Sequence, residues 1–356
     1  MIEFRRLDLF QFRNYGQASF AFTEKVVGIS GRNGSGKTNL LDAVHYLCFT
    51  KSYFPRTDAQ SVMKDCAGFR IAGNFLENGE PLEVASILRE NGKKELQLNQ
   101  EPCRKFSSHI GRLPCVMIAP DDVEIIQGAS ELRRKLIDAI ISQMDKDYLQ
   151  ALIDYNKVLQ QRNSLLKAEG VDFGLLDILD MQLVAKGNVI FAKRRDFAVQ
   201  YAPLVLEQYL AIAEETDNVA VQYVSKLANE PFEKLIVQAR QKDLLLQRTT
   251  VGIHRDDLNL LMDGIPFKNV ASQGQRKSLL FAIKLAEYQM LHEARRQPPI
   301  LLLDDVFEKL DADRMQHLLQ IVCTYQDSMV FISDTHEERL RTAFDGLGIR
   351  YQLVAL

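Results

Sequence analysis

The sequence has few cysteines, little net charge and no long apolar run. Its five cysteines are scattered along 356 residues without a Cys-x-x-Cys pair, which argues against disulfides and zinc sites and favours buried thiols in a reducing compartment. No apolar run approaches the roughly 18 residues of a membrane-spanning helix, and the first residues lack the apolar core of a signal peptide. We therefore expect a cytoplasmic chain with no membrane partner.

The formal net charge at pH 7 is only −3. Any nucleic-acid site must then be a local patch, because the overall field of the protein does not attract phosphate. A hydrophobic fraction of 46% and a charged fraction of 26% are typical of a globular protein. The length predicts about two domains.

The strongest single signal lies in residues 26–43. An apolar, β-branched run is followed by glycines at 31, 34 and 36, and a helical pattern then begins at Lys37. Glycines let successive backbone N–H groups surround an anion, and the N-terminus of the following helix adds positive potential. Lys37 would reach the β- and γ-phosphates of ATP, and the Thr38 hydroxyl would ligate Mg²⁺. The predicted phosphate-binding loop consists of Gly31, Arg32, Asn33, Gly34, Ser35, Gly36, Lys37 and Thr38.

Two acids end a continuous apolar run over residues 299–303, the pattern of a central parallel strand. In an open α/β sheet, ligands bind at the carboxyl ends of the strands. Asp304 is the expected partner of Mg²⁺ beside Thr38, and Asp305 is expected to orient or deprotonate the attacking water. The alternative is an acid pair that only caps the next helix.

The order of the remaining patterns predicts an α/β domain interrupted by helices. Strands are expected between residues 2 and 30, a helix over 37–49, an antiparallel meander over 69–98 with two Asn-Gly turns, and a strand over 114–119. Long stretches with a 3.6-residue period then follow, and strands return after Thr249. The strand before the phosphate loop and the strand that ends at Asp304 must share one sheet. The expected domains are residues 1–128 (ATPase domain, N-terminal part), 129–248 (inserted helical domain) and 249–356 (ATPase domain, C-terminal part).

A second candidate anion site is the helix start at residues 272–275, Ser-Gln-Gly-Gln. Ser272 and Gly274 would present a hydroxyl and free N–H groups to a phosphate. Taken alone, this pattern is equally that of an ordinary helix cap.

Three short basic clusters are candidates for DNA contacts, and each is also compatible with a solvated surface: Arg133-Arg134-Lys135, Lys193-Arg194-Arg195 and Lys51 to Arg56. Binding through them would be salt-sensitive and largely independent of DNA sequence. The stretch His254-Arg255-Asp256 lacks partner acids at ligand spacing, which argues against a metal site. We expect an Arg-Asp pair that fixes the junction between the insertion and the sheet, or that places Arg255 near the nucleotide.

Together, the phosphate loop, the strand ending at Asp304 and the start at Ser272 resemble the ATP-binding-cassette (ABC) ATPase heads of the SMC type. The resemblance narrows at residues 250–258 (TVGIHRDDL) and 119–128 (APDDVEIIQG), followed by Arg133-Arg134. These stretches are similar to the signatures of the bacterial RecF family of DNA replication and repair proteins. The similarity covers essentially the whole chain and implies an ABC-ATPase-like P-loop domain, with a mixed sheet and an antiparallel β subdomain, that carries an inserted α-helical domain.

The resemblance implies a weak, DNA-stimulated ATPase that forms an ATP-dependent homodimer. Ser272 and Gly274 of one protomer would cover the γ-phosphate held by the other, Lys309-Leu310-Asp311 would be the D-loop, and Ser333 to His336 would occupy the switch position. The family binds single-stranded, gapped or junction DNA and helps to load the recombinase with RecO and RecR. It is also required for a normal SOS response.

Two departures from transporter cassettes are visible. Asp305 stands where transporters carry glutamate, so the carboxylate is one methylene further back and slow turnover is expected. No glutamine follows the strand over 114–119, so Asp121 or Asp122 is the candidate for sensing Mg²⁺. A transport ATPase is disfavoured by these departures, and an architectural SMC protein by the short insertion. An ATP-binding switch or adaptor with negligible hydrolysis remains the alternative.

Overall fold

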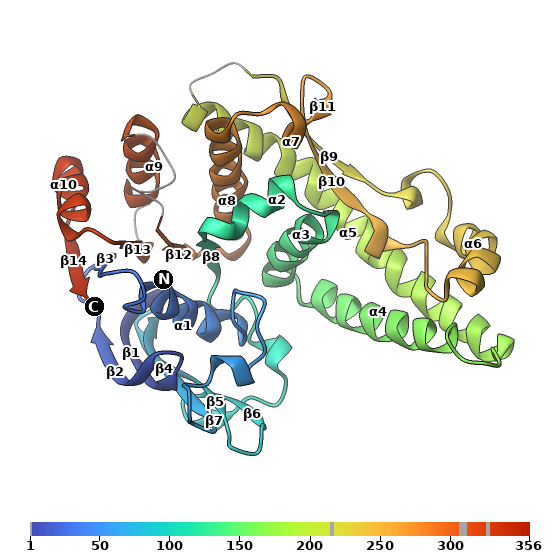
Figure 1. Cartoon of the computed structure of the whole chain (residues 1–356), viewed down its shortest axis with the longest axis horizontal. Coiled ribbons are helices and arrows are strands. Elements are labelled where there is room, and N and C mark those ends of the chain that lie inside the picture. The colour runs from blue at the N-terminus through green and yellow to red at the C-terminus, as the bar shows by residue number, and fades with distance from the viewer. Residues whose placement is uncertain (1, 214–216, 306–311, 325–327) are drawn as a thin grey trace. The chain divides into compact units, whose positions relative to one another are not determined.

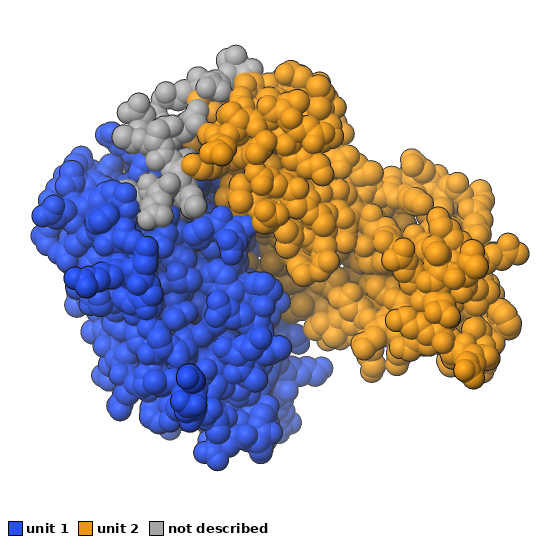
Figure 2. Space-filling view, viewed as in Figure 1, with its two compact units in different colours: residues 1–122, 281–356 blue, residues 123–280 orange. Residues whose placement is uncertain are grey.

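The computed structural model describes residues 2–213, 217–305, 312–324 and 328–356. The chain forms two compact units, shown in blue and orange in Figure 2: residues 1–122 with 281–356 (unit 1), and residues 123–280 (unit 2). The unit boundaries differ from the expected ones at 128/129 and 248/249. The larger difference arises because the strands that follow Thr249 pair within unit 2.

Unit 1 contains a parallel sheet with the strand order β14-β3-β13-β12-β8. Every residue of β3, β12 and β13 is buried, as expected for central parallel strands covered on both faces. The strand before the phosphate loop and the strand before Asp304 therefore share one sheet, as predicted, with β13 between them. The strands are β3 (Val26–Ser30), β8 (Cys115–Ile118), β12 (Ile300–Leu303), β13 (Val330–Asp334) and β14 (Tyr351–Ala355).

A second, antiparallel sheet of unit 1 has the order β2-β1-β4-β5-β6-β7. The predicted meander is confirmed as β4, β5 and β6, and Asn78 (φ 55°) and Gly79 (φ 87°) form the first of its tight turns. The strands are β1 (Ile2–Phe12), β2 (Tyr15–Ala21), β4 (Phe69–Glu77), β5 (Glu80–Leu88), β6 (Lys94–Leu98) and β7 (Glu101–Pro102).

Helix α1 (Lys37–Phe49) lies between the two sheets of unit 1, and α9 (Ala312–Thr324) and α10 (Glu337–Leu347) lie on the other side of the parallel sheet (Figure 1). The predicted helix over 37–49 is thus confirmed. Buried side chains from α1 and both sheets form one hydrophobic core, in which Phe4 packs against both Phe75 and Phe331. This core fixes the start of α1 beside the carboxyl ends of β3, β12 and β13.

Unit 2 is mostly helical, as predicted for the insertion, but it also contains the antiparallel sheet β11-β10-β9. Strand β9 lies within the expected helical domain over 129–248 and was not predicted, because its partner β10 lies more than 30 residues further along the chain and no local pattern marks the pairing. The elements are α2 (Glu124–Gln127), α3 (Ser130–Met144), α4 (Lys146–Leu165), α5 (Phe173–Ala213), β9 (Val219–Val224), α6 (Phe232–Leu246), β10 (Asp257–Met262), β11 (Ile265–Pro266) and α7 (Phe267–Val270).

Helix α8 (Gln273–Arg295) begins in unit 2 and ends in unit 1. Short 3-10 turns occur at Ala59–Ser61, Phe106–Ser108, Pro120–Val123, Lys226–Ala228 and Ile253–Arg255. In the part of the chain that the structure describes, no helix is both long and apolar enough to cross a membrane.

Candidate active site

The phosphate loop connects the end of β3 to the start of α1. Arg32, Asn33 and Gly34 are exposed at its crest, whereas Gly36 and Lys37 are buried at its base. Gly36 has a φ of 118°, and a Cβ there would lie 2.7 Å from the Tyr15 hydroxyl. Only glycine combines this backbone conformation with this space. The backbone conformation of the loop is therefore fixed at Gly36, directly before α1 begins.

The Lys37 side chain folds back across the loop. Its Nζ donates a hydrogen bond to the Gly31 carbonyl at 3.0 Å and lies 3.9 Å from Oδ1 of Asp305. The side chain is only 4% exposed. Its positive charge is thus held where an anion bound by the loop N–H groups would lie.

Asp304 lies beside Thr38 at the carboxyl end of the parallel sheet. The Thr38 hydroxyl donates to Asp304 at 2.8 Å, and the Ser333 hydroxyl donates to the same carboxylate at 2.7 Å. Burial raises the pKa of Asp304 to about 6, although both hydrogen bonds favour the ionised form. The two residues expected to ligate Mg²⁺, Thr38 and Asp304, are therefore brought into direct contact.

Asp305 adopts a φ of 45°, which is uncommon for a residue other than glycine. Its N–H donates to the Ser333 hydroxyl at 2.9 Å, so Ser333 contacts both acids. The Asp305 side chain is partly exposed and faces Lys37. The sequence predicts Ser333 at the switch position but not its contacts with the two acids. Those contacts follow from the pairing of β12 with β13, because Ser333 follows Ile332, the partner of Leu303.

Ser272 and Gly274 lie in unit 2, and Ser272 is exposed. Ser272 and Gln275 form a capping box: the Gln275 N–H donates to Ser272 Oγ at 3.2 Å, and the Ser272 N–H donates to Gln275 Oε1 at 2.8 Å. Gln275 also donates from Nε2 to Asp217 at 3.0 Å. The cap that the sequence left as an alternative is thus present. The expected D-loop, Lys309-Leu310-Asp311, lies outside the described residues.

The expectation that Asp122 senses Mg²⁺ is not supported by its contacts. Its Oδ2 accepts from the Ala119 N–H at 2.8 Å, and its Oδ1 accepts from the Tyr53 hydroxyl at 2.5 Å. The same buried cluster contains Lys284 and Glu287, which form an ion pair at 3.3 Å. Both Asp122 carboxylate oxygens are therefore used in hydrogen bonds within the protein. Asp121 is exposed.

In two of the three basic clusters, some arginines make contacts inside unit 2. Arg133 forms a two-pronged ion pair with Asp257, with its Nε 2.8 Å from Oδ1, and is only 11% exposed. Arg134 donates to the Asp256 carbonyl at 2.6 Å. The ion pair argues against Arg133 as a DNA contact, because its guanidinium group is already paired within the protein. For Arg134 the DNA contact stays a prediction.

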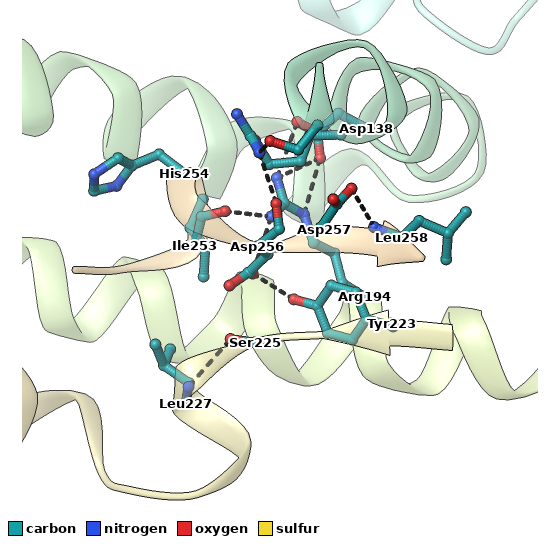
Figure 3. A network of polar contacts seen from close by, with 12 residues as sticks. Asp138, Arg194, Tyr223, Ser225, Leu227, Ile253, His254, Asp256, Asp257 and Leu258 are labelled. Carbon is teal, nitrogen blue, oxygen red and sulfur yellow. Dashed lines mark hydrogen bonds and ion pairs between the residues drawn. The ribbon is translucent and has the colours of Figure 1, made fainter. Parts of the chain in front are cut away.

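Arg194 lies at the centre of a buried polar network (Figure 3). It is only 1% exposed, forms two bonds to Asp138 from its NH2 group, and lies 3.2 Å from Asp256. The Tyr223 hydroxyl donates to Asp256 at 2.5 Å. The prediction of Arg194 as a DNA contact is therefore wrong. In these two clusters, the side chains of Lys135, Lys193 and Arg195 are exposed.

His254 and Asp256 belong to the interior of unit 2. The His254 ring contacts the Tyr155 hydroxyl at 2.8 Å, and burial lowers the pKa of His254 to about 4. The Arg-Asp pair expected here exists, but it joins Asp256 to Arg194. Arg255 instead contacts the Thr249 carbonyl at 3.4 Å.

Comparison with known proteins agrees with the motifs. A family model described as the RecF/RecN/SMC N terminal domain matches residues 3–352. The chain is 38% identical over 336 residues to the DNA replication and repair protein RecF of Parabacteroides distasonis, which spans 94% of this chain and 92% of the relative. It is 37% identical over 351 residues to RecF of Bacteroides thetaiotaomicron, which spans 98% of this chain and 95% of the relative.

Solved structures show the same relationship. One, described as the recombination mediator protein RecF-ATP in the RecFOR pathway, superposes with a TM-score of 0.87 at 28% identity and covers 94% of this chain and 92% of that chain. An Smc head domain from Pyrococcus yayanosii superposes with a TM-score of 0.58 at 11% identity, covering 100% of this chain and 95% of that one, which shows a shared fold. This chain belongs to the RecF family, and its fold is that of the ABC-type ATPase heads of SMC proteins.

Proposed function

We propose that this chain is an ATP-dependent DNA-binding protein of recombinational repair and replication. It dimerises around ATP on single-strand gaps or junctions, helps RecO and RecR to load the recombinase, and contributes to a normal SOS response in the cytoplasm. Hydrolysis then separates the dimer. The observation that carries this proposal is the convergence of Lys37, Thr38, Asp304, Asp305 and Ser333 at the end of one parallel sheet. The names of the relatives support the role in DNA repair.

Nucleotide binding would rest on the loop and on the N-terminus of α1. The backbone N–H groups of the loop and the dipole of α1 provide positive potential, and buried Lys37 supplies a full charge. ATP binding is also supported by the family member whose structure is described as RecF-ATP. The phosphates would replace the Gly31 carbonyl as the partner of the Lys37 Nζ.

The donor set at the base of the site fits Mg²⁺. The Thr38 hydroxyl and the Asp304 carboxylate are hard oxygen ligands of the kind that this ion prefers, and they are adjacent. When bound there, the ion would neutralise charge on the β- and γ-phosphates. Ser333 keeps the Asp304 carboxylate oriented through its 2.7 Å hydrogen bond.

Asp305 is the residue we assign to the attacking water. Its carboxylate would accept the water proton as the water oxygen attacks the γ-phosphorus and ADP leaves. An aspartate reaches less far than a glutamate, which supports slow hydrolysis suited to timing the release of DNA. If hydrolysis is negligible, the same residues describe an ATP-binding switch or adaptor.

Among the basic residues predicted to contact DNA, we favour Lys51 and Arg56. Both are exposed, whereas Arg133 and Arg194 are committed to ion pairs. Replacing Lys51 and Arg56 by glutamine should weaken DNA binding and lower the slope of log K against log salt by about one per lost phosphate contact. The double change Arg89→Gln and Lys93→Gln, at exposed residues outside the three clusters, is the matched control. An unchanged affinity after replacing Lys51 and Arg56, or an equal loss in the control, would remove Lys51 and Arg56 from the interface.

The molar mass in solution tests the dimer. Light scattering with ADP, with ATP and with ATP plus Mg²⁺ should give dimers only when ATP is present, and only monomers for Lys37→Met and Ser272→Arg. Ser19→Arg places the same side chain on an exposed residue of β2 and should dimerise like the wild type. If the molar mass does not change with nucleotide, or if Ser272→Arg forms dimers like the wild type, Ser272 is only a helix cap.

A further inference from the structure

The turn between β1 and β2 contacts the phosphate loop from the side of unit 1's antiparallel sheet. Asn14 donates from Nδ2 to the Ser35 carbonyl at 2.9 Å, and the Tyr15 hydroxyl donates to the Gly36 carbonyl at 3.1 Å. The Asn14 amide is itself oriented, because Asn39 on α1 donates to its Oδ1 at 2.8 Å. Two successive carbonyls of the loop therefore accept hydrogen bonds from this hairpin, and the Gly36 carbonyl also accepts from the Leu40 N–H of α1 at 2.8 Å.

The orientation of these carbonyls decides where the neighbouring N–H groups point. In a planar trans peptide, the C=O of one residue and the N–H of the next point in opposite directions. A Ser35 carbonyl held by Asn14 turns the Gly36 N–H away from the turn, and a Gly36 carbonyl held by Tyr15 does the same for the Lys37 N–H. These are N–H groups of the anion cradle that the loop sequence predicts.

The turn is also pressed tightly against the loop. A Cβ on Gly36 would lie 2.7 Å from both Asn14 Nδ2 and the Tyr15 hydroxyl. Tyr15 is buried, and burial raises its pKa above the ordinary value, so the hydroxyl keeps its proton and remains a donor. Both groups that contact the loop, the Asn14 amide and the Tyr15 hydroxyl, are therefore neutral hydrogen-bond donors. Neither adds a negative charge that would repel a phosphate.

We propose that Asn14 and Tyr15 are positioning residues for nucleotide binding: they fix the peptide units of the phosphate loop so that the Gly36 and Lys37 N–H groups face the phosphates. This inference rests on the proposed function of the loop. The loop N–H groups cradle the α- and β-phosphates, which ATP and ADP share. Removing the Asn14 or the Tyr15 contact should therefore weaken the binding of both nucleotides by the same factor.

Calorimetric titration with ADP and with ATP tests the proposal on Asn14→Ala and Tyr15→Phe in the full chain. Each change removes one hydrogen bond to the loop, so we expect the Kd of both nucleotides to rise about 3- to 10-fold, with the ratio of the two Kd values as in the wild type. Gln17→Ala is the matched control, since Gln17 lies exposed on the same hairpin. The thermal unfolding temperature without nucleotide is measured for every variant.

The outcomes distinguish a failure of the positioning role from a failure of nucleotide binding by the loop. Kd values within about twofold of the wild type for both variants would overturn the positioning role, as would a rise matched by Gln17→Ala or a loss for ATP alone. A lower unfolding temperature with unchanged Kd values would also overturn it, because the contacts would then serve stability only. If the wild type and Lys37→Met bind nucleotide equally, the proposed function of the loop fails, and this inference fails with it.

Discussion

Arg194 offers the sharpest test of how unit 2 is held together. Arg194→Met keeps much of the side-chain length but removes the charge from a network in which Asp256 is only 1% exposed. Breaking a buried ion pair by removing one partner costs about 3–5 kcal/mol, because the other charge is left buried. With a urea dependence of about 2 kcal/mol per molar, the midpoint of unfolding should fall by about 1.5–2.5 M.

Urea unfolding of the full chain can be followed by far-ultraviolet circular dichroism, since the sequence contains no tryptophan and unit 2 is mostly helical. Arg195→Met is the adjacent control. Arg195 pairs with Asp196, and both side chains are about 60% exposed, so its removal should cost at most about 1 kcal/mol. Equal midpoints for the two variants would refute the assignment of Arg194 to the interior.

The cost of Arg194→Met should also depend on pH. Burial raises the pKa of Asp256 even with Arg194 present, and without the arginine this rise is less opposed. The folded variant then binds a proton more readily than the unfolded chain, so its stability recovers relative to the wild type as the pH falls below neutral. A destabilisation that does not change with pH would contradict this reasoning.

Gly36→Ala should abolish measurable ATP binding, because φ is 118° and a Cβ would collide with the Tyr15 hydroxyl; calorimetry that shows wild-type affinity would disprove the fit. Asp305→Asn should keep ATP-driven dimers while phosphate release falls about 10²- to 10⁴-fold, and unchanged release would point to another base. His254 has a folded pKa of about 4 against an ordinary 6.5, so the wild type should lose stability as the pH falls through this window, by about 3 kcal/mol at its acid end. His254→Gln should lose less over the same window, and parallel pH curves of urea midpoints would contradict the neutral buried ring.

The features that sequence reasoning found correctly are those with a local cause. Glycines at 31, 34 and 36 before Lys37 specify a phosphate loop because the backbone conformation and the helix start are properties of adjacent residues. The apolar run before Asp304 identified a central strand because a parallel strand is buried on both faces. The two Asn-Gly turns of the meander were visible for the same reason.

The features that it missed depend on residues far apart in the chain. A run such as Lys193-Arg194-Arg195 has the same appearance whether it is solvated or buried, and only the folded chain brings Asp138 and Asp256 to Arg194. Likewise, β9 reads as part of a helical block until β10 pairs with it.

The sequence alone therefore determined the family, the phosphate loop and the central strands, because short-range backbone geometry and continuous burial leave a local pattern. The tertiary structure decided which charges are paired, that Ser333 contacts both acids, and that Asn14 and Tyr15 contact the loop. These contacts join residues between 21 and 124 positions apart, at distances of about 3 Å. The cost of burying an unpaired polar group selects them only once the chain has folded.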